Sequence, residues 1–213
     1  MLDLDNIYKD FIPCYSLDLT GWFEEDQFVQ DLINNYKPKT IIEVGTWKGK
    51  SAIYMAECLK KLNLQSRIFC VDTWTGASEF WTWASRTSER DLLFKHGMPQ
   101  VYYQFLSNVV HTSNQEIIYP LPVPSNTGYE IFNYYKIKAD LIYIDASHEY
   151  IDVLTDITNY SQLLNDSGII FGDDYNNLSF PGVKSAVEDF LKNNANWKLT
   201  LSGETRYWLL TKY

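Results

Sequence analysis

Three aspartates follow two apolar segments that are typical of buried strands. Asp145 comes directly after residues 141–144, and Asp173 and Asp174 follow residues 168–171 and a glycine. The carboxyl ends of parallel strands meet at one edge of a sheet, where ligands bind. Three carboxylates there repel one another unless a cation neutralises them, and oxygen ligands of this kind suit Mg²⁺. The pattern predicts a magnesium site of Asp145, Asp173 and Asp174. For any one of these aspartates alone, a structural role is favoured, namely capping a loop or, for Asp145, orienting a backbone turn.

A histidine lies beside the first of these aspartates. The chain has three histidines, and His148 is the one that adjoins a candidate metal ligand, Asp145. An unperturbed imidazole has a pKa of roughly 6.5, so it can accept a proton near neutral pH. We therefore expect His148 and Asp145 to be the catalytic residues, with His148 as the group that accepts a proton. A packing or surface role for His148 is the alternative.

Residues 43–51, Glu-Val-Gly-Thr-Trp-Lys-Gly-Lys-Ser, form a glycine-containing loop between a predicted strand and a predicted helix. Glycines let the backbone turn sharply and let a ligand approach the main chain. The dinucleotide fingerprint G-x-G-x-x-G is not met, because Trp47 occupies the place of the second glycine. The phosphate-loop pattern G-x-x-x-x-G-K-[ST] is not met either, because the segment from Gly45 to Gly49-Lys50-Ser51 is one residue shorter than this pattern. A phosphate-loop ATPase is therefore the weaker interpretation.

The pattern that remains, acidic-Val-Gly-x-x-x-Gly-x-Ser, resembles motif I of the class I S-adenosylmethionine-dependent methyltransferases. That cofactor carries a sulfonium cation and no phosphate, so a carboxylate such as Glu43 suits the loop. Asp72, at the end of the next predicted strand, matches the residue that receives the ribose hydroxyls in this family. Ser125 and Asn126 follow the third strand, where the family contacts adenine. The resemblance implies that the cofactor is bound by Glu43, Gly45, Thr46, Lys48, Gly49, Ser51, Asp72, Ser125 and Asn126.

The three aspartates resemble those of a narrower group, the metal-dependent O-methyltransferases. This group includes the catechol and caffeoyl-coenzyme A enzymes and the macrocin-type enzymes that methylate sugar hydroxyls. The catechol branch ends its acidic pair with Asp-Asn, so the pair Asp173-Asp174 follows the sugar branch, and His148 stands where the catechol branch has Lys. The similarity runs from about residue 39 to about residue 190. It implies Mg²⁺-dependent methyl transfer to a hydroxyl of a small polyhydroxylated molecule, for example a sugar.

Two other functions stay open at this point. A non-catalytic nucleotide-binding module would keep the loop at residues 43–51, but pure binding does not require the pair Asp173-Asp174. The cephalosporin hydroxylase group has a similar scaffold, which leaves the reaction itself open.

Alternating apolar patterns predict the elements that position these residues. Strands are expected at 40–44, 67–71, 117–121, 141–144 and 168–171, helices at 22–36, 51–62, 152–164 and 181–193, and a terminal hairpin at 197–201 and 207–211. Such alternation specifies a doubly wound, mostly parallel α/β sheet. The resemblance implies the seven-stranded, Rossmann-like methyltransferase fold with a C-terminal antiparallel hairpin. We expect a single domain, 1–213, with an aromatic-rich insertion at about 74–115 over the active site.

The composition limits the partners. A net charge of −9 and a pI near 4.8 argue against nucleic acid, because a phosphate backbone requires clustered Lys and Arg. No apolar run approaches the ~20 residues of a membrane-spanning helix, and the acidic N-terminus is unlike a signal peptide. The three cysteines have neither disulfide nor zinc spacing. These features predict a cytoplasmic protein. The sequence does not fix the oligomeric state, and a homodimer is compatible with it.

Overall fold

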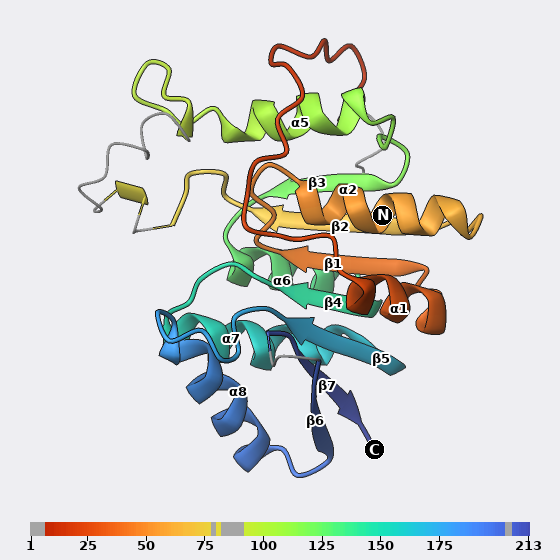
Figure 1. Cartoon of the computed structure of the whole chain (residues 1–213), viewed down its shortest axis with the longest axis vertical. Helices are drawn as coiled ribbons and strands as arrows, with labels where there is room; N and C mark the ends of the chain where they lie inside the picture. Colours follow the sequence, from red (N-terminus) through yellow and green to blue (C-terminus); the bar gives the residue numbers. More distant parts are fainter. Residues whose placement is uncertain (1–6, 78–79, 82–91, 203–205) are drawn as a thin grey trace.

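The computed structural model describes residues 7–77, 80–81, 92–202 and 206–213. Within these residues the strands form one seven-stranded sheet of order β3-β2-β1-β4-β5-β7-β6 (Figure 1). The strands are β1 (Thr40–Val44), β2 (Arg67–Asp72), β3 (Ile118–Pro122), β4 (Ala139–Ile144), β5 (Leu164–Gly172), β6 (Trp197–Leu201) and β7 (Trp208–Lys212). The first five are parallel, and β7 runs antiparallel to both β5 and β6. The predicted fold class is confirmed.

Helices cover both faces of the sheet. On one face lie α1 (Gln27–Tyr36), α2 (Lys50–Lys61) and α5 (Val101–His111), and on the other lie α6 (Ser125–Tyr134), α7 (Tyr150–Tyr160) and α8 (Pro181–Asn193). Successive strand residues point to opposite faces. Ile41 therefore packs in the core with α1, α2 and α5, whereas Ile42 packs in the core with α6, α7 and α8. No helix in the described part of the chain is long and apolar enough to cross a membrane.

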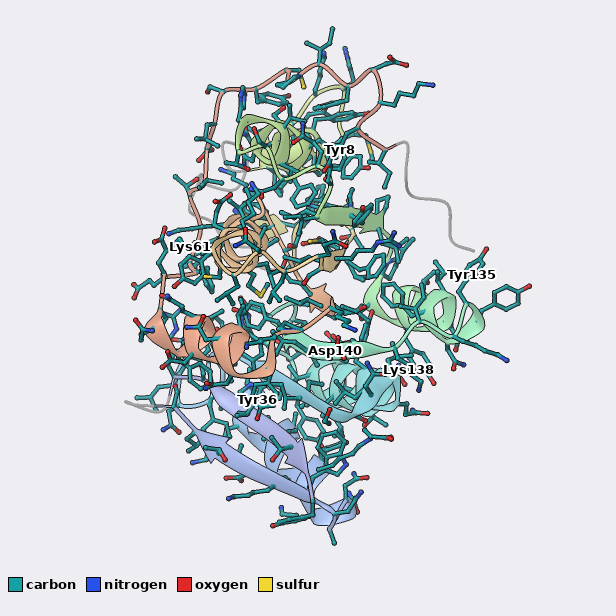
Figure 2. All side chains as sticks on the ribbon, turned by 90° about the vertical axis from the view of Figure 1, so that its right-hand side faces the viewer. Tyr8, Tyr36, Lys61, Tyr135, Lys138 and Asp140 are labelled. Carbon is teal, nitrogen blue, oxygen red and sulfur yellow. The ribbon has the colours of Figure 1, made fainter. Side chains whose placement is uncertain are left out.

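One carboxylate joins three strands at the amino edge of the sheet. Asp140, labelled in Figure 2, accepts the backbone N–H groups of Lys39 at 2.8 Å and Thr40 at 3.0 Å, just where β1 begins. Its other oxygen accepts a hydrogen bond from the side chain of Asn165 in β5 at 2.6 Å. These contacts set the alignment of β1, β4 and β5, and so the relative positions of their carboxyl ends.

Two helices were not predicted from the sequence, namely α5 and α6. α5 connects β2 to β3, and its Phe105 and Val109 lie fully buried in the core. Residues 101–111 of the predicted insertion at 74–115 thus form a crossover helix packed on the sheet. Of the preceding segment, residues 78–79 and 82–91 lie outside the described residues.

The segment before α1 is held against α5 by buried polar side chains. The hydroxyl oxygen of Ser107 accepts the N–H of Cys14 at 3.2 Å. The amide of Asn108 accepts the N–H of Asp18 at 3.0 Å and donates to the carbonyl of Asp18 at 2.6 Å. These contacts satisfy the backbone of an extended segment that has no strand partner of its own. They also direct the following residues toward the carboxyl edge of the sheet.

A guanidinium–carboxylate pair joins the C-terminal hairpin to β5. Arg206 Nε donates to Asp173 Oδ1 at 2.8 Å, and Arg206 Nη2 donates to Asp173 Oδ2 at 2.7 Å. The Asp173 side chain is only 6% exposed, so this carboxylate depends on its partner. Nη2 also donates to the carbonyl of Trp22 at 3.1 Å. One side chain thus connects β5, the hairpin and the N-terminal segment.

Replacing this guanidinium should cost stability. In Arg206→Met the buried Asp173 carboxylate loses its counter-charge, and we expect the free energy of unfolding to fall by about 3 kcal/mol. Urea denaturation measures the change, and Arg67→Met at the exposed start of β2 is the matched control, with an expected change within about 0.5 kcal/mol. Adding Asp173→Asn to Arg206→Met should recover much of the loss. An Arg206→Met protein as stable as the control would contradict the role of the pair.

Candidate active site

The loop between β1 and α2 turns at a glycine that approaches another strand closely. Gly45 has a φ of 84°, in the left-handed region that glycine occupies without strain. A β-carbon there would collide with the carbonyl oxygen of Asp145 and with the backbone of Ala146. The glycine is therefore required by the contact between this loop and the end of β4. The sequence had suggested instead that the glycine leaves room for a ligand.

A buried carboxyl lies beneath the loop. Glu43 is fully buried, and it accepts hydrogen bonds from the hydroxyls of Thr46 and Ser51 and from the thiol of Cys70. Burial is the main cause that raises its pKa to about 8, and the Ser51 and Cys70 hydrogen bonds oppose that shift. The side chain of the predicted cofactor residue Glu43 thus lies beneath the loop and holds it in place, and it does not line the cavity that opens at the carboxyl ends of the parallel strands.

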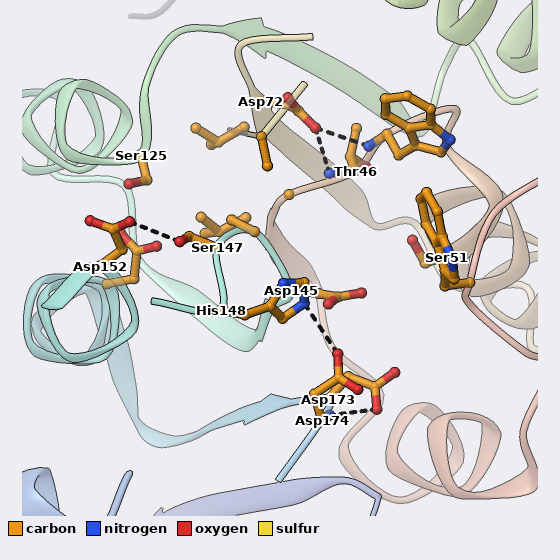
Figure 3. A pocket seen from close by; sticks show the side chains of 18 of the residues that line it. Thr46, Ser51, Asp72, Ser125, Asp145, Ser147, His148, Asp152, Asp173 and Asp174 are labelled. Atoms are coloured by element: carbon orange, nitrogen blue, oxygen red, sulfur yellow. Dashed lines mark hydrogen bonds and ion pairs between the residues drawn. The ribbon is translucent and has the colours of Figure 1, made fainter. Parts of the chain in front are cut away.

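A second carboxylate fixes the upper side of the same loop. Asp72, at the end of β2, accepts the backbone N–H groups of Thr46 and Trp47 on one oxygen, each at 2.9 Å. Its other oxygen accepts the N–H of Trp74 at 2.7 Å. Figure 3 shows these two hydrogen bonds to the loop at the rim of the cavity. Two N–H groups that could have faced an anionic ligand are therefore used within the protein.

Lys48 has a different role from the one predicted. Its ammonium group donates to Asp18 Oδ2 at 2.8 Å and to the hydroxyl of Thr20 at 2.9 Å, and its side chain is 5% exposed. Lys48 therefore fastens the N-terminal segment to the loop. Neither Lys48 nor Gly49 lines the cavity.

A cavity of about 700 Å³ opens above the carboxyl ends of the parallel strands. Its size is typical of sites for small molecules and cofactors. The predicted site residues that line it are Gly45, Thr46, Ser51, Asp72, Ser125, Asn126, Asp145, His148, Asp173 and Asp174. Figure 3 shows how most of these side chains surround one space, although they come from five different strand ends. These predicted residues therefore lie at one cavity, and their roles in binding and catalysis stay a prediction.

Three of these residues could hold a metal ion. Ligand atoms of Asp145, His148 and Asp174 lie within 4.8 Å of one another, and they form the only such group in the described residues. His148 Nε2 lies 3.2 Å from Asp174 Oδ2, and the imidazole stacks on the ring of Phe180 with centroids 3.7 Å apart. The hydroxyl of Tyr143 donates to Asp145 at 2.8 Å. Two carboxylates and an imidazole are thus fixed at the ends of β4 and β5.

The two carboxyls of this group differ in acidity. Burial, followed by the charge of Asp173, raises the pKa of Asp145 to about 6. Burial acts in the same direction on Asp174, but hydrogen bonds from His148 and Asn177 outweigh it and hold the pKa of Asp174 below its usual value. Asp145 therefore carries an unfavourable charge at neutral pH that a bound cation would relieve.

Asp173 does not join this group. Both of its oxygens accept hydrogen bonds from the guanidinium of Arg206, and Oδ1 also accepts the N–H of Asp174. Adjacent residues point in different directions here because Asp174 has a φ of 62°, which turns the chain as it leaves β5. The predicted set of three aspartates is thus not assembled in this structure, and the neighbouring ligand atoms belong to Asp145, His148 and Asp174.

Three aromatic side chains form one wall of the cavity. The rings of Trp47 and Phe80 stack with centroids 4.8 Å apart, and Trp22 lies edge-on to Phe80 at 5.6 Å. Trp22 is 68% exposed, which is unusual for a large apolar side chain next to a cavity. Neither Trp22 nor Arg206 was predicted from the sequence to lie at the site. Neither belongs to a local motif, and only the folded chain brings them to the carboxyl edge.

A family model and solved structures resemble this chain. Residues 42–175 match the model of a family described as a methyltransferase domain. An O-methyltransferase from Bacillus cereus, solved in complex with SAH, superposes with a TM-score of 0.61 at 16% identity, over 87% of this chain and 79% of that one. A putative caffeoyl-CoA O-methyltransferase from Staphylococcus aureus has a TM-score of 0.62 at 14% identity, over 92% and 86% of the two chains. The calicheamicin methyltransferase CalS11 has a TM-score of 0.62 at 18% identity, over 86% and 77%.

A curated relative is much longer than this chain. The protein y4gI of Sinorhizobium fredii is 23% identical over 155 residues, which are 73% of this chain but 15% of y4gI. The family match covers the loop, Asp72 and the acidic group at the ends of β4 and β5, and the superpositions cover 86% to 92% of the chain. The chain accordingly belongs to the methyltransferase-domain family and has its Rossmann-like fold.

Proposed function

We propose that the chain is an S-adenosylmethionine-dependent O-methyltransferase that acts on a small polyhydroxylated molecule. The observation that carries the proposal is the charge of the cavity. Asp72, Asp145, Asp152, Asp156, Asp173 and Asp174 all line it, against the cations of Lys50 and Arg206. Arg206 is already paired with Asp173. A cavity of this charge favours a sulfonium cation and disfavours a polyphosphate.

The loop itself argues against the two nucleotide-binding alternatives. A phosphate loop works because its N–H groups point at the phosphate. Here the N–H groups of Thr46 and Trp47 point at Asp72, which is itself an anion. A phosphate in that place would compete with Asp72 for these donors and would be repelled by it. The same geometry suits a cofactor whose ribose hydroxyls donate to the remaining lone pairs of Asp72.

Residues of this chain would bind and orient the reactants. S-adenosylmethionine, when bound, supplies a methyl group on a positively charged sulfur. Gly45 and Thr46 offer backbone contact beside the end of β4, and Ser125 and Asn126 offer polar groups after β3. The wall of Trp22, Trp47 and Phe80 would exclude water from the acceptor. Methyl transfer depends mainly on holding the methyl group and its sulfur in line with the attacking oxygen of the acceptor.

The acidic group fits a divalent cation. Mg²⁺ is commonly held by one or two carboxylates and completes its coordination with water or substrate oxygens, so Asp145 and Asp174 suffice. Such an ion would lower the pKa of a bound hydroxyl. Asp174 also orients His148, whose imidazole would accept the hydroxyl proton while the carboxylate stabilises the resulting positive charge. A chelating pair of hydroxyls, as in a sugar, suits this arrangement.

The acceptor class draws support from a structural neighbour. CalS11 is described as a TDP-rhamnose 3'-O-methyltransferase, and its apo structure superposes with a TM-score of 0.54. Flat aromatic rings such as those of Trp22 and Phe80 provide an apolar surface for one face of a pyranose, while the carboxylates at the ends of β4 and β5 face its hydroxyls. We therefore propose a sugar-like acceptor.

Cofactor choice is tested by calorimetry with two ligands. The chain should bind S-adenosylhomocysteine and should bind ATP at least about 100-fold more weakly, because like-charge contacts with the acidic lining cost several kcal/mol. Equal or tighter binding of ATP would point to a nucleotide-binding module instead.

Metal use is tested at Asp174. Asp174→Asn should weaken Mn²⁺ binding by at least about tenfold and abolish most methyl transfer, while S-adenosylhomocysteine affinity stays nearly unchanged. Calorimetry measures the affinities, and release of S-adenosylhomocysteine measures turnover with a panel of catechols and methyl glycosides. Asp166→Asn, at the exposed opposite end of β5, is the control. Full turnover after exhaustive EDTA treatment would assign the chain to metal-independent chemistry.

One variant distinguishes between His148 as a general base and His148 as a metal ligand. His148→Gln should lower kcat by about 10²–10⁴-fold and remove the acidic limb of the pH–rate profile, because the general base is lost. Mn²⁺ affinity should stay within a few-fold of the wild type, with the exposed His96→Gln as control. A loss of Mn²⁺ affinity similar to that of Asp174→Asn would make His148 a metal ligand, and an unchanged kcat would exclude it as the base.

A further inference from the structure

A fully buried tyrosine contacts the acidic group from the core of the protein. Tyr143 lies in β4, two residues before Asp145, so the two side chains point to the same face of the sheet. Tyr143 is 0% exposed and does not line the cavity. Its hydroxyl donates to Asp145 Oδ2 at 2.8 Å. This hydrogen bond joins the hydrophobic core to a candidate metal ligand.

The ring of Tyr143 has little freedom to move. It stacks on the ring of Phe171, its register partner in β5, with centroids 4.6 Å apart and planes 13° apart. The ring of Phe23, which does line the cavity, lies edge-on to it at 6.4 Å. Aromatic contacts of this kind in a closely packed core hold a side chain in one orientation. The position of the hydroxyl is therefore set by β4 and β5 themselves.

The carboxylate of Asp145 benefits from a fixed partner. The main chain of Asp145 is held because its N–H donates to the carbonyl of Val44 at 2.8 Å. Rotation about the side-chain bonds would still move its two oxygens, and the hydroxyl of Tyr143 restricts that rotation. An ionised carboxylate has about four acceptor positions, so positions remain for an ion. Mg²⁺ requires nearly ideal octahedral geometry, and a carboxylate held in one orientation suits that requirement.

A neighbouring tyrosine shows that a buried hydroxyl in this cluster does not have to be paired with a carboxylate. Tyr207 is also 0% exposed, and its ring lies edge-on to Phe171 with centroids 6.4 Å apart. Within the described residues, its hydroxyl has no hydrogen-bond partner. The pairing of Tyr143 with Asp145 therefore requires an explanation beyond the burial of a phenol.

We propose that Tyr143 is a positioning residue that orients the carboxylate of Asp145 for a divalent cation. The inference rests on the proposed function, because it concerns the ion that Asp145 and Asp174 would hold. Tyr143 touches neither the ion nor the reactants and acts through Asp145 alone. Supporting contacts of this kind typically change metal affinity by about 10-fold to 100-fold.

The test compares Tyr143→Phe with Tyr207→Phe, which removes the same atom from the same aromatic cluster. Calorimetry with Mn²⁺ alone should show an affinity lowered by about 10-fold to 100-fold in Tyr143→Phe and within a few-fold of the wild type in Tyr207→Phe. The electron paramagnetic resonance spectrum of the bound Mn²⁺, which depends on the geometry of its ligands, should change in Tyr143→Phe alone. The affinity for S-adenosylhomocysteine should stay nearly unchanged in both variants.

Two results would overturn the inference while the wild-type chain binds Mn²⁺. One is an unchanged Mn²⁺ affinity and spectrum in a Tyr143→Phe protein that melts cooperatively. The other is an equal loss of Mn²⁺ affinity in both variants, or a parallel loss of Mn²⁺ and S-adenosylhomocysteine affinity in Tyr143→Phe, because either would make Tyr143 a packing residue.

A measurement on the wild-type chain decides the matter if Tyr143→Phe does not fold. In a crystal structure with Mn²⁺ bound, the hydroxyl of Tyr143 should still donate to Asp145, and a hydroxyl that has turned away from Asp145 overturns the inference. A wild-type chain that binds S-adenosylhomocysteine but no Mn²⁺ overturns the metal-dependent part of the proposed function, and the inference with it.

Discussion

The carboxylate of Asp72 joins the loop after β1 to the end of β2, and the shape of the cavity follows from this contact. By accepting the N–H groups of Thr46, Trp47 and Trp74, it fixes both sides of the cavity rim. The indole of Trp74 donates in turn to the carbonyl of Trp47 at 2.7 Å, which helps to place the aromatic wall. Because an anion already occupies the donors of the loop, the cavity is unsuited to phosphate and open to a cation.

Charge is the second constraint, since several carboxylates converge at one edge of the sheet. The charge of each carboxylate is stabilised to a different extent by its neighbours. Asp173 is neutralised by Arg206, Asp174 is supported by His148, and Asp145 keeps a raised pKa because burial and Asp173 both oppose its ionisation. The uncompensated charge is thus concentrated at Asp145, beside the place where a metal ion and a positively charged sulfur would lie.

Much of the fold could be predicted from the sequence, because the buried parallel strands are short β-branched runs that end in Gly or Asp. β1, β2, β4 and β5 were therefore located within a few residues. α5 was missed because its buried face includes the polar residues Ser107 and Asn108, which hold the N-terminal segment and break the apolar period. α6 was missed because Ser125 and Asn126 at its start are typical of a loop.

The site was predictable where it depends on strand ends, and unpredictable where it depends on distant partners. Asp145, Asp174 and Asp72 follow from local pattern. The different partners of Asp173 and Asp174 could not be predicted from local pattern. Asp173 pairs with Arg206, which lies 33 residues away in the sequence. Lys48 matched a cofactor loop in sequence, yet its partner Asp18, 30 residues earlier, turns it away from the cavity.

The most direct test of this account is a crystal structure of the chain with S-adenosylhomocysteine and Mn²⁺. We predict that the ribose hydroxyls contact Asp72, that the base lies beside Ser125, and that the sulfur faces a metal ion held by Asp145 and Asp174. The N–H groups of Thr46 and Trp47 should remain on Asp72, as they are in Figure 3. A ligand bound outside this cavity, or a loop whose N–H groups turn from Asp72 to the ligand, would contradict the account.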